Sequence, residues 1–175
     1  IAALVGATGG AGTTRLTVES AALLAATGRS VAVFDAAVQT QGLATYTDQR
    51  IDADLTALLT GEADLDTTLY EMDLDLPGVV NLCPAWAPFE RLSRAKTAGA
   101  ANRFEQQLAA AALSHDAVLL DTPPLGGNQA IAAVNAADWV SLVAPDSPRG
   151  RDGRGLTRDR LGDNGTGSDA VIAAL

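Results

Sequence analysis

A glycine-rich segment from Gly6 to Thr14 contains the residues whose types and spacing point most directly to chemistry. It reads Gly-Ala-Thr-Gly-Gly-Ala-Gly-Thr-Thr, and it lies between an apolar stretch at residues 1–5 and a predicted helix. Backbone amides and the start of a helix would then face one point, an arrangement that binds phosphate or another anion. The segment has the frame of a phosphate-binding loop, but it lacks the lysine that gives such a loop its charge.

Two aspartates come directly after apolar segments. Asp35 follows residues 30–34, and Asp121 follows residues 117–120. Functional sites in parallel sheets lie at the carboxyl ends of the strands. We therefore expect residues 6–14, 35–42 and 121–127 to lie along one edge of a sheet.

The hydrophobic pattern predicts the elements that position these segments. Short apolar stretches typical of buried strands cover residues 1–5, 30–34, 79–82, 117–120 and 139–143. Helices are predicted at residues 14–27, 54–59 and 128–135, with one or two more in the Ala-rich stretch 89–113. The alternation predicts an α/β fold with three layers, in which helices flank a mainly parallel sheet.

The segment from Asp146 to Asp169 differs in composition from the rest of the chain. Gly, Arg, Asp and Ser are crowded there with little hydrophobic periodicity. The pattern predicts a mobile surface segment or a weak helix. Residues 170–175 are predicted as a final strand.

Composition limits the class of protein. The chain has 175 residues, of which 47% are hydrophobic, and residues 1–175 are predicted to form a single domain. Its net charge of -9, with one lysine, indicates a salt-adapted surface whose carboxylates need screening by counterions. This charge argues against nucleic acid as a partner.

The cysteine content and the lack of long apolar stretches bear on the compartment. Cys83 is the only cysteine, so a reducing compartment is expected, by default a cytoplasm and in this case one of high salt. No signal peptide and no membrane-spanning segment is expected in this sequence.

Three segments together resemble the MinD/ParA family of deviant Walker-A ATPases. They are the glycine-rich segment, the strand end at residues 31–37 and the sequence His-Asp-Ala-Val-Leu-Leu-Asp-Thr-Pro-Pro at residues 115–124. The resemblance extends to about Arg160. It implies a P-loop NTPase-like fold that lacks the family's C-terminal part.

The resemblance assigns roles within the loop. Thr8 stands at the position of the family's signature lysine, and Thr13 at that of the lysine that contacts the β and γ phosphates. Both cations are therefore replaced. Thr14 remains where the family's hydroxyl ligates magnesium.

The carboxylates are interpreted in the same way. Asp35 and Asp121 match the family's acidic residues near magnesium, so the resemblance implies a metal site at Thr14, Asp35 and Asp121. Ala37 replaces the aspartate that orients the attacking water. No catalytic residue of the family is thus intact.

The losses at Thr8, Thr13 and Ala37 predict a pseudo-ATPase that acts as a regulatory or protein-interaction module, as a homodimer or with another protein. Phosphoryl transfer depends on positive charge and on a positioned nucleophile, so three losses should leave little turnover. The alternative is a slow ATPase for spatial positioning or partitioning, in which Gln39 or Gln41 places the water. A purely structural domain is the third interpretation.

Nucleotide binding is a separate question from hydrolysis. The amides of the loop can still face the phosphates of ATP or ADP with Mg²⁺. The candidate nucleotide-binding residues are Gly9, Gly10, Gly12, Thr13 and Thr14. The alternative is that the glycines only form a tight turn between strand and helix.

Other residues receive structural interpretations. His115 is predicted to be a surface or capping residue, and Cys83 a buried apolar one. Trp86 and Phe89 are expected to pack in the core, with an exposed partner surface as the alternative. The arginines between Arg149 and Arg160 alternate with aspartates and are expected to be solvated.

Overall fold

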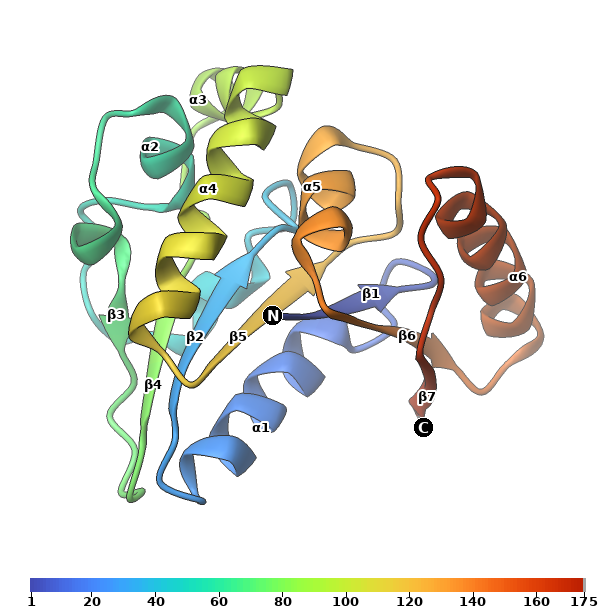
Figure 1. Ribbon diagram of the computed structural model, residues 1–175, viewed down its shortest axis with the longest axis horizontal. Coiled ribbons are helices and arrows are strands. Elements are labelled where there is room, and N and C mark those ends of the chain that lie inside the picture. Colours follow the sequence, from blue (N-terminus) through green and yellow to red (C-terminus); the bar gives the residue numbers. More distant parts are fainter. Residues whose placement is uncertain (175) are drawn as a thin grey trace.

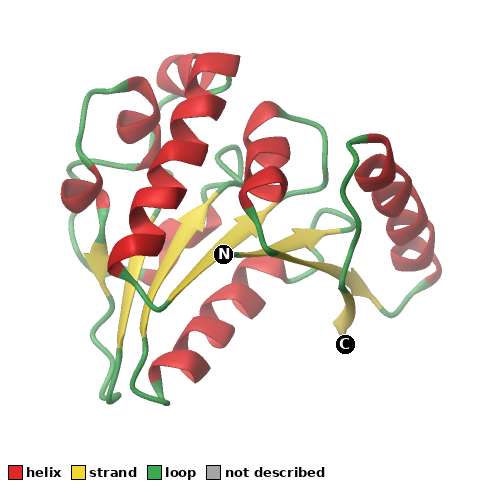
Figure 2. Cartoon of the chain, in the orientation of Figure 1, coloured by secondary structure: helices red, strands yellow, loops and turns green. Residues whose placement is uncertain are grey.

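The computed structural model describes residues 1–174, and its strands form one sheet at the centre of the molecule (Figure 2). In spatial order the strands are β3 (Tyr70–Glu71), β4 (Val79–Cys83), β2 (Ser30–Asp35), β5 (Ala117–Thr122), β1 (Ala2–Gly6), β6 (Trp139–Pro145) and β7 (Ala170–Ala174). Only β3 and β4 pair antiparallel among these neighbours. The predicted α/β class with a mainly parallel sheet is confirmed.

Helices cover both faces of this sheet, as Figure 1 shows. The α-helices are α1 (Thr13–Ala25), α2 (Leu55–Thr60), α3 (Phe89–Ala95), α4 (Ala98–Ser114), α5 (Asn128–Ala136) and α6 (Pro148–Asp163), and the short 3-10 helices are η1 (Gly42–Tyr46) and η2 (Leu65–Thr68). Helix α1 lies on one face, and α4 and α5 lie on the other. The stretch 89–113 therefore forms two helices.

The central strands are mainly apolar because most of their residues are buried on both faces. In β2, Val31 and Val33 pack with residues of α1, whereas Ala32 and Phe34 pack with residues of α4. The ring of Phe34 lies 6.2 Å from that of Phe104, between centroids. Burial on two sides thus fixes each strand between helical layers and directs its carboxyl end to one edge.

The register of the strands brings the two aspartates together at that edge. Asp35 at the end of β2 lies opposite Asp121 of β5, and Asp121 also lies opposite Leu4 of β1. The glycine-rich loop follows β1 directly. The expectation that these segments share one edge of the sheet is confirmed.

The segment from Asp146 to Asp169 contains a helix, α6, which corresponds to the second of the two predicted alternatives, a mobile segment or a weak helix. Ser147 caps this helix by accepting a hydrogen bond from the Gly150 amide at 3.1 Å, and Pro148 occupies its first turn. The helix packs through Gly150, Thr157 and Leu161, and its start lies very close to β6, because a Cβ on Gly150 would lie 1.9 Å from the Pro145 carbonyl oxygen. Hydrophobic periodicity misses a helix that packs through glycine.

Two further strands complete the sheet. The predicted strand at residues 170–175 corresponds to β7, although Leu175 lies outside the described residues. Strand β3 was not predicted, because it is only two residues long. It forms the edge of the sheet next to β4.

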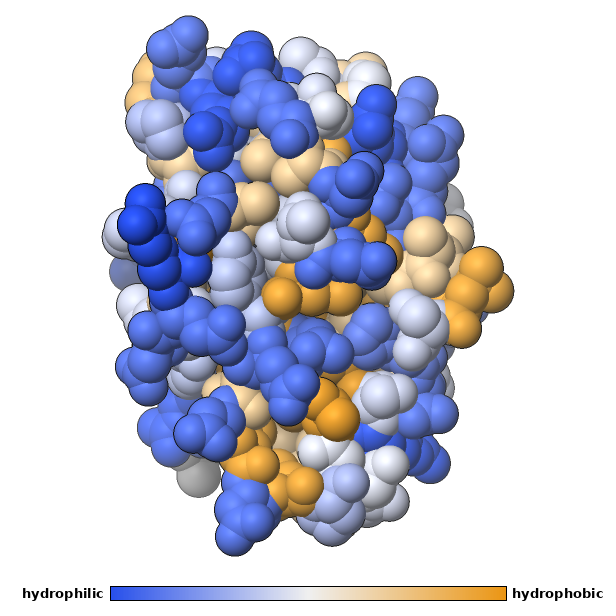
Figure 3. All heavy atoms as spheres, turned by 90° about the vertical axis from the view of Figure 1, so that its left-hand side faces the viewer, coloured by the Kyte–Doolittle hydropathy of each residue, from blue (hydrophilic) through white to orange (hydrophobic). Residues whose placement is uncertain are grey.

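The surface beside this edge is mainly hydrophilic. Figure 3 shows this side of the molecule, where hydrophobic side chains form separated patches among hydrophilic ones. Within residues 1–174, no helix combines the length and the apolar character that crossing a bilayer requires.

The close contact of α6 predicts opposite effects for two glycine substitutions. Gly150→Ala is expected to lower the free energy of unfolding by about 1–3 kcal/mol, because the new methyl group must displace the Pro145 backbone. Gly155→Ala in the same helix meets no atom within 4 Å and is expected to raise it by about 0.5–1 kcal/mol. Urea denaturation of both variants measures the difference, and equal effects would contradict this packing.

Candidate functional site

The loop after β1 is held open by its backbone conformation. Gly10 and Gly12 have φ values of 77° and 81°, in the left-handed region that glycine adopts without strain. The Ala7 amide donates to the Val143 carbonyl of β6 at 2.8 Å, and the Ala11 amide donates to the Thr8 carbonyl at 3.3 Å. These two bonds fix the ends of a turn whose remaining amides face outward.

Those remaining amides form a set of hydrogen-bond donors without protein acceptors among the described residues. In the described residues 1–174, the backbone amides of Gly9, Gly10, Gly12, Thr13 and Thr14 have no hydrogen-bond acceptor. The first bond of α1 runs from the Leu16 amide to the Gly12 carbonyl, and the first turn has neither a side-chain cap nor an acidic residue. Free amides and an uncompensated helix dipole favour an anion at this position.

A cavity of about 430 Å³ lies over these amides. The five candidate nucleotide-binding residues, Gly9, Gly10, Gly12, Thr13 and Thr14, all line this cavity, and so do Thr8 and Asp121. The structure therefore brings the loop and one of the two carboxylates to the same space. Asp35 lies beside Asp121 through the sheet register, below the cavity wall.

Thr8 and Thr13, which stand where the resemblance leads us to expect lysines, have short neutral side chains. Thr8 packs under α6, where a Cβ on Gly153 would lie 2.4 Å from the Thr8 methyl carbon. The Thr13 hydroxyl lies close to Gly6, since a Cβ on Gly6 would be 2.8 Å from it. Arg15 borders the cavity, but its guanidinium forms an ion pair with Glu19 at 2.7 Å. The loop cavity thus has no unpaired cation among its described lining residues.

Asp35 and Asp121 are buried and incompletely satisfied. Asp35 Oδ2 accepts long hydrogen bonds from the amides of Leu43 and Ala85, both at 3.4 Å. Asp35 Oδ1 and Asp121 Oδ2 have no hydrogen-bond partner in the described part of the chain. Buried polar atoms are almost always paired, so two carboxylate oxygens without partners on neighbouring strands are an exception that protonation or a bound cation would satisfy.

Burial also changes the acidity of this pair. Desolvation, together with the nearby charge of Asp121, raises the pKa of Asp35 to about 7. Desolvation raises the pKa of Asp121 to about 6, although a hydrogen bond from the Thr14 hydroxyl opposes the shift. Burial thus destabilises the charged form of both carboxylates, and a divalent cation would reverse this effect.

The residues present fit Mg²⁺. Carboxylate and hydroxyl oxygens are hard ligands, and Thr14, Asp35 and Asp121 supply them within one small region. Residues 1–174 contain no cluster of three or more His, Cys, Asp or Glu residues suited to a metal. A site with few protein ligands suits Mg²⁺, which keeps waters and binds phosphate oxygens as well.

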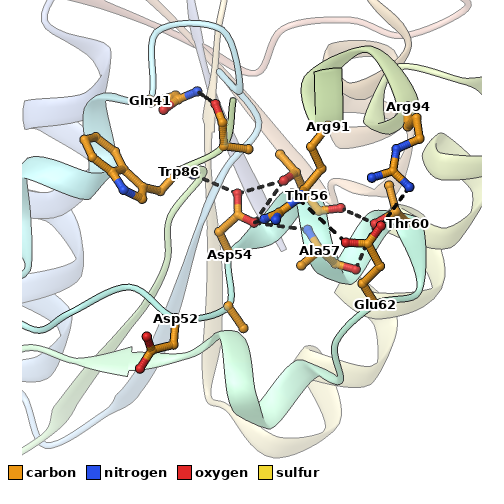
Figure 4. Close-up of polar contacts among 12 residues, drawn as sticks. Gln41, Asp52, Asp54, Thr56, Ala57, Thr60, Glu62, Trp86, Arg91 and Arg94 are labelled. Carbon is orange, nitrogen blue, oxygen red and sulfur yellow. Dashed lines mark hydrogen bonds and ion pairs between the residues drawn. The ribbon is translucent and has the colours of Figure 1, made fainter. Parts of the chain in front are cut away.

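Ala37, where the resemblance to the family leads us to expect a water-orienting aspartate, has no polar side chain. Ala37 lines the loop cavity, and its amide donates to the Asp121 carbonyl at 3.1 Å. Gln41 has a positive φ of 53°. Its side-chain nitrogen Nε2 donates a hydrogen bond to the Ala87 carbonyl at 2.9 Å (Figure 4). Gln41 is therefore engaged outside the cavity. Gln39 is exposed and lines a second, adjoining cavity of about 540 Å³.

A buried aspartate fixes the segment after β4. Asp54 caps α2 by accepting from the Ala57 amide at 3.2 Å, and it also accepts from the Thr56 hydroxyl at 2.9 Å. The Trp86 amide donates to it at 2.7 Å, and Arg91 pairs with it at 3.2 Å (Figure 4). The side chain of Asp54 thus ties together α2, the loop before α3 and α3 itself.

The aromatic residues of this segment are exposed. Trp86 and Phe89 keep 58% and 80% of their surface accessible, so the expectation that they pack in the core was wrong. Asp54 binds the backbone of Trp86 and not its ring, which leaves the ring outside the core. His115 occupies the predicted capping position at the end of α4, and Cys83 is buried as predicted.

Several residues of the site had no signal in the sequence. Thr45 and Tyr46 line the loop cavity from η1, beside Thr40 and Gly42 of the predicted segment 35–42. Their types fit many surface loops, and only the path of the chain after Asp35 brings them here. The Asp54 cluster was missed for the same reason, since its members are far apart in sequence.

Comparison with known proteins was made by sequence and by structure. A family model described as an AAA domain matches residues 1–157. No curated protein matches the chain. The fold is similar to that of the septum site-determining protein MinD complexed with Mg-ADP from Pyrococcus horikoshii, with a TM-score of 0.82 and 18% identity over 99% of this chain and 70% of that one.

Two other solved structures share the fold. The kinase domain of the Escherichia coli tyrosine kinase ETK has a TM-score of 0.80 and 22% identity, over 99% of this chain and 67% of that one. Cobyrinic acid a,c-diamide synthase from Mycobacterium smegmatis, with bound ADP and magnesium, has a TM-score of 0.74 and 21% identity, over 97% of this chain and 71% of that one. These three proteins have different names and activities, so the likeness establishes the fold alone.

The raised pKa values predict how stability depends on pH without a cation. Asp35 has a higher pKa in the folded chain than its ordinary value of 3.8, so its contribution to stability is lost as the pH rises through about 7. From pH 5 to pH 8, the wild type is expected to lose more than about 1 kcal/mol relative to Asp35→Asn, measured by urea denaturation in EDTA. Asp116→Asn is the control, because hydrogen bonds from Ser30 lower the pKa of Asp116 and it stays charged in this range. Parallel curves for wild type and Asp35→Asn would contradict the prediction.

The Asp54 cluster predicts a large loss of stability from one substitution. Asp54→Ala removes the cap of α2 and leaves the Trp86 amide without its acceptor, so we expect a loss of about 2–4 kcal/mol. Asp52→Ala removes an exposed carboxylate that pairs only with Arg50, and we expect a change within about 0.5 kcal/mol. Thermal and urea denaturation compare the two variants, and a similar small effect for both would show that Asp54 does not anchor this segment.

Proposed function

Because this chain belongs to the AAA domain family and has the fold of MinD, we propose that it is a P-loop module that binds Mg-nucleotide with little or no hydrolysis and acts through protein contacts. The single observation that carries the proposal is that the loop keeps a phosphate cradle of free backbone amides, whereas the residues at the family's catalytic positions are replaced. The cradle has free amides at Gly9, Gly10, Gly12, Thr13 and Thr14. The catalytic positions are Thr8, Thr13 and Ala37.

Nucleotide binding is supported by the donors and the carboxylates together. The free amides and the start of α1 suit the phosphates of ATP or ADP. Thr14, Asp35 and Asp121 would hold Mg²⁺, and its charge would offset the phosphates in a loop without lysine. The orphaned oxygens Asp35 Oδ1 and Asp121 Oδ2 supply the independent reason for a cation here.

Loss of hydrolysis is supported by what surrounds the same cavity. A preorganised contact to the transition state contributes about 3–4 kcal/mol to lowering the barrier, and two lysines and one carboxylate are replaced. Gln41 is bonded to the Ala87 carbonyl and does not face the cavity with a free amide. Turnover should therefore be very slow even when nucleotide is bound.

A slow ATPase in spatial positioning or partitioning is the second candidate. The observation that favours it is that Gln39 is exposed and lines the second, adjoining cavity together with Ala37. An amide can orient a water molecule, as a carboxylate does. This candidate requires turnover that depends on Asp121 and on Gln39.

The proposed output is a contact with another protein or a second copy of this chain. Trp86 and Phe89 are exposed on the segment that Asp54 anchors, at the same end of the sheet as the loop. Exposed aromatic residues are enriched in protein interfaces. We propose that this surface and the loop cavity serve one regulatory function.

Restoring the missing charge tests the proposal. Thr13→Lys is expected to tighten Mg-ATP binding about tenfold or more, because a charge-assisted contact to phosphate replaces a neutral hydroxyl. Thr27→Lys adds the same charge beyond the far end of α1 and should leave the affinity unchanged. Calorimetric titration with Mg-ATP and Mg-ADP in molar KCl, followed by a phosphate-release assay, measures both binding and turnover.

The two candidates separate in this experiment. Binding by the wild type without phosphate release supports the proposed module. Absence of binding by both the wild type and Thr13→Lys would contradict it. Release of phosphate that is abolished in Asp121→Ala would instead establish the slow ATPase.

A further inference from the structure

A second cavity adjoins the loop cavity and has not been assigned a role. Its volume is about 540 Å³. It shares four wall residues with the loop cavity, namely Ala37, Thr40, Pro123 and Pro124. The two cavities are therefore neighbours on one edge of the sheet, and a ligand in the first would face the second.

The only lysine of the chain lines this second cavity. Lys96 follows α3 directly and is half-buried. Within the described residues its ammonium has no carboxylate partner within 4 Å, although most nearby arginines are paired. An unpaired cation in a cavity of an acidic protein is available to a ligand.

The position of Lys96 is fixed through its backbone. The Asn128 side-chain amide donates to the Lys96 carbonyl at 2.8 Å. The Gln129 side chain, only 3% exposed, donates to the neighbouring Ala95 carbonyl. The first residues of helix α5 thus hold the end of helix α3 in place. The lysine side chain is left free while its backbone is anchored.

The lining of the cavity is suited to negative charge. None of its described lining residues carries a carboxylate, although the chain has 21 acidic residues. The side-chain amide of Gln39 lines it, and α5 begins there after Gly127 without a side-chain cap. Amide donors and one ammonium group favour an oxyanion over a cation or an apolar ligand.

We propose that Lys96 binds a phosphate-type oxyanion in this second cavity and so supplies the cation that the glycine-rich loop lacks. Two sources share this chemistry: the terminal phosphate of a nucleotide bound in the loop, and a separate phosphate group beside it. The first source rests on the proposed function, and the second does not. Lys96 lines the second cavity together with Ala37, which also lines the loop cavity.

The test compares the intact chain with Lys96→Gln, Lys96→Arg and Arg103→Gln. Calorimetry measures affinity for Mg-ATP and Mg-ADP, and thermal unfolding with inorganic phosphate or chloride at equal ionic strength measures anion binding. Arg103→Gln removes an exposed positive charge of α4 that does not line the cavity, which controls for net charge.

Two results would support the inference and identify the source. If Lys96→Gln weakens Mg-ATP binding about tenfold, leaves Mg-ADP binding unchanged and Lys96→Arg restores it, the oxyanion is the terminal phosphate. If inorganic phosphate raises the unfolding temperature of the wild type and of Lys96→Arg but not of Lys96→Gln, the oxyanion is a separate group.

Other results would overturn it. Equal Mg-ATP affinity and equal response to phosphate in wild type and Lys96→Gln would remove any role for Lys96 in binding. A loss of the same size in Arg103→Gln would show only a net-charge effect. If the wild type binds no nucleotide, the proposed function fails, and the response to inorganic phosphate alone decides this inference.

Discussion

Two buried carboxylates on neighbouring strands are the constraint on which the rest of this site depends. Parallel pairing of β2 and β5 places Asp35 opposite Asp121, and burial removes the water that would solvate their charges. One oxygen of each has no partner in the described residues. Such a pair is costly unless it is protonated or holds a cation. A fold that keeps it intact therefore keeps a site with a strong preference for positive charge.

The glycine-rich loop has the opposite electrostatic preference. Its amides and the start of α1 favour negative charge, and its lining has no unpaired cation. The carboxylate pair and the loop adjoin the same cavity of about 430 Å³. Magnesium bound to phosphate would satisfy both at once, because the metal pairs with the carboxylates and the phosphates pair with the amides. This complementarity does not depend on a lysine in the loop, and it is the reason why we propose that binding and hydrolysis separate in this chain.

Packing around the edge of the sheet decides which side chains are available. Glycines in α6 let that helix cover Thr8, and Asn128 and Gln129 hold the end of α3 so that Lys96 lines the second cavity. Asp54 uses its whole acceptor capacity on α2, Trp86 and Arg91, and this leaves the aromatic rings outside the core. The region around the loop is therefore built from backbone contacts, while the side chains that face solvent remain free.

The sequence by itself determined the α/β class, the course of the main strands and the loop that follows β1. These features depend on local patterns, since apolar runs such as residues 30–34 and glycines before a helix act over a few residues. It also placed Asp35 and Asp121 at one edge, because parallel strands share their carboxyl ends. Only the tertiary structure decided that α6 is a packed helix, that Trp86 and Phe89 are exposed and that Lys96 lies beside the loop. Each of these features depends on contacts between residues far apart in the chain. Such contacts produce no periodic pattern in the sequence.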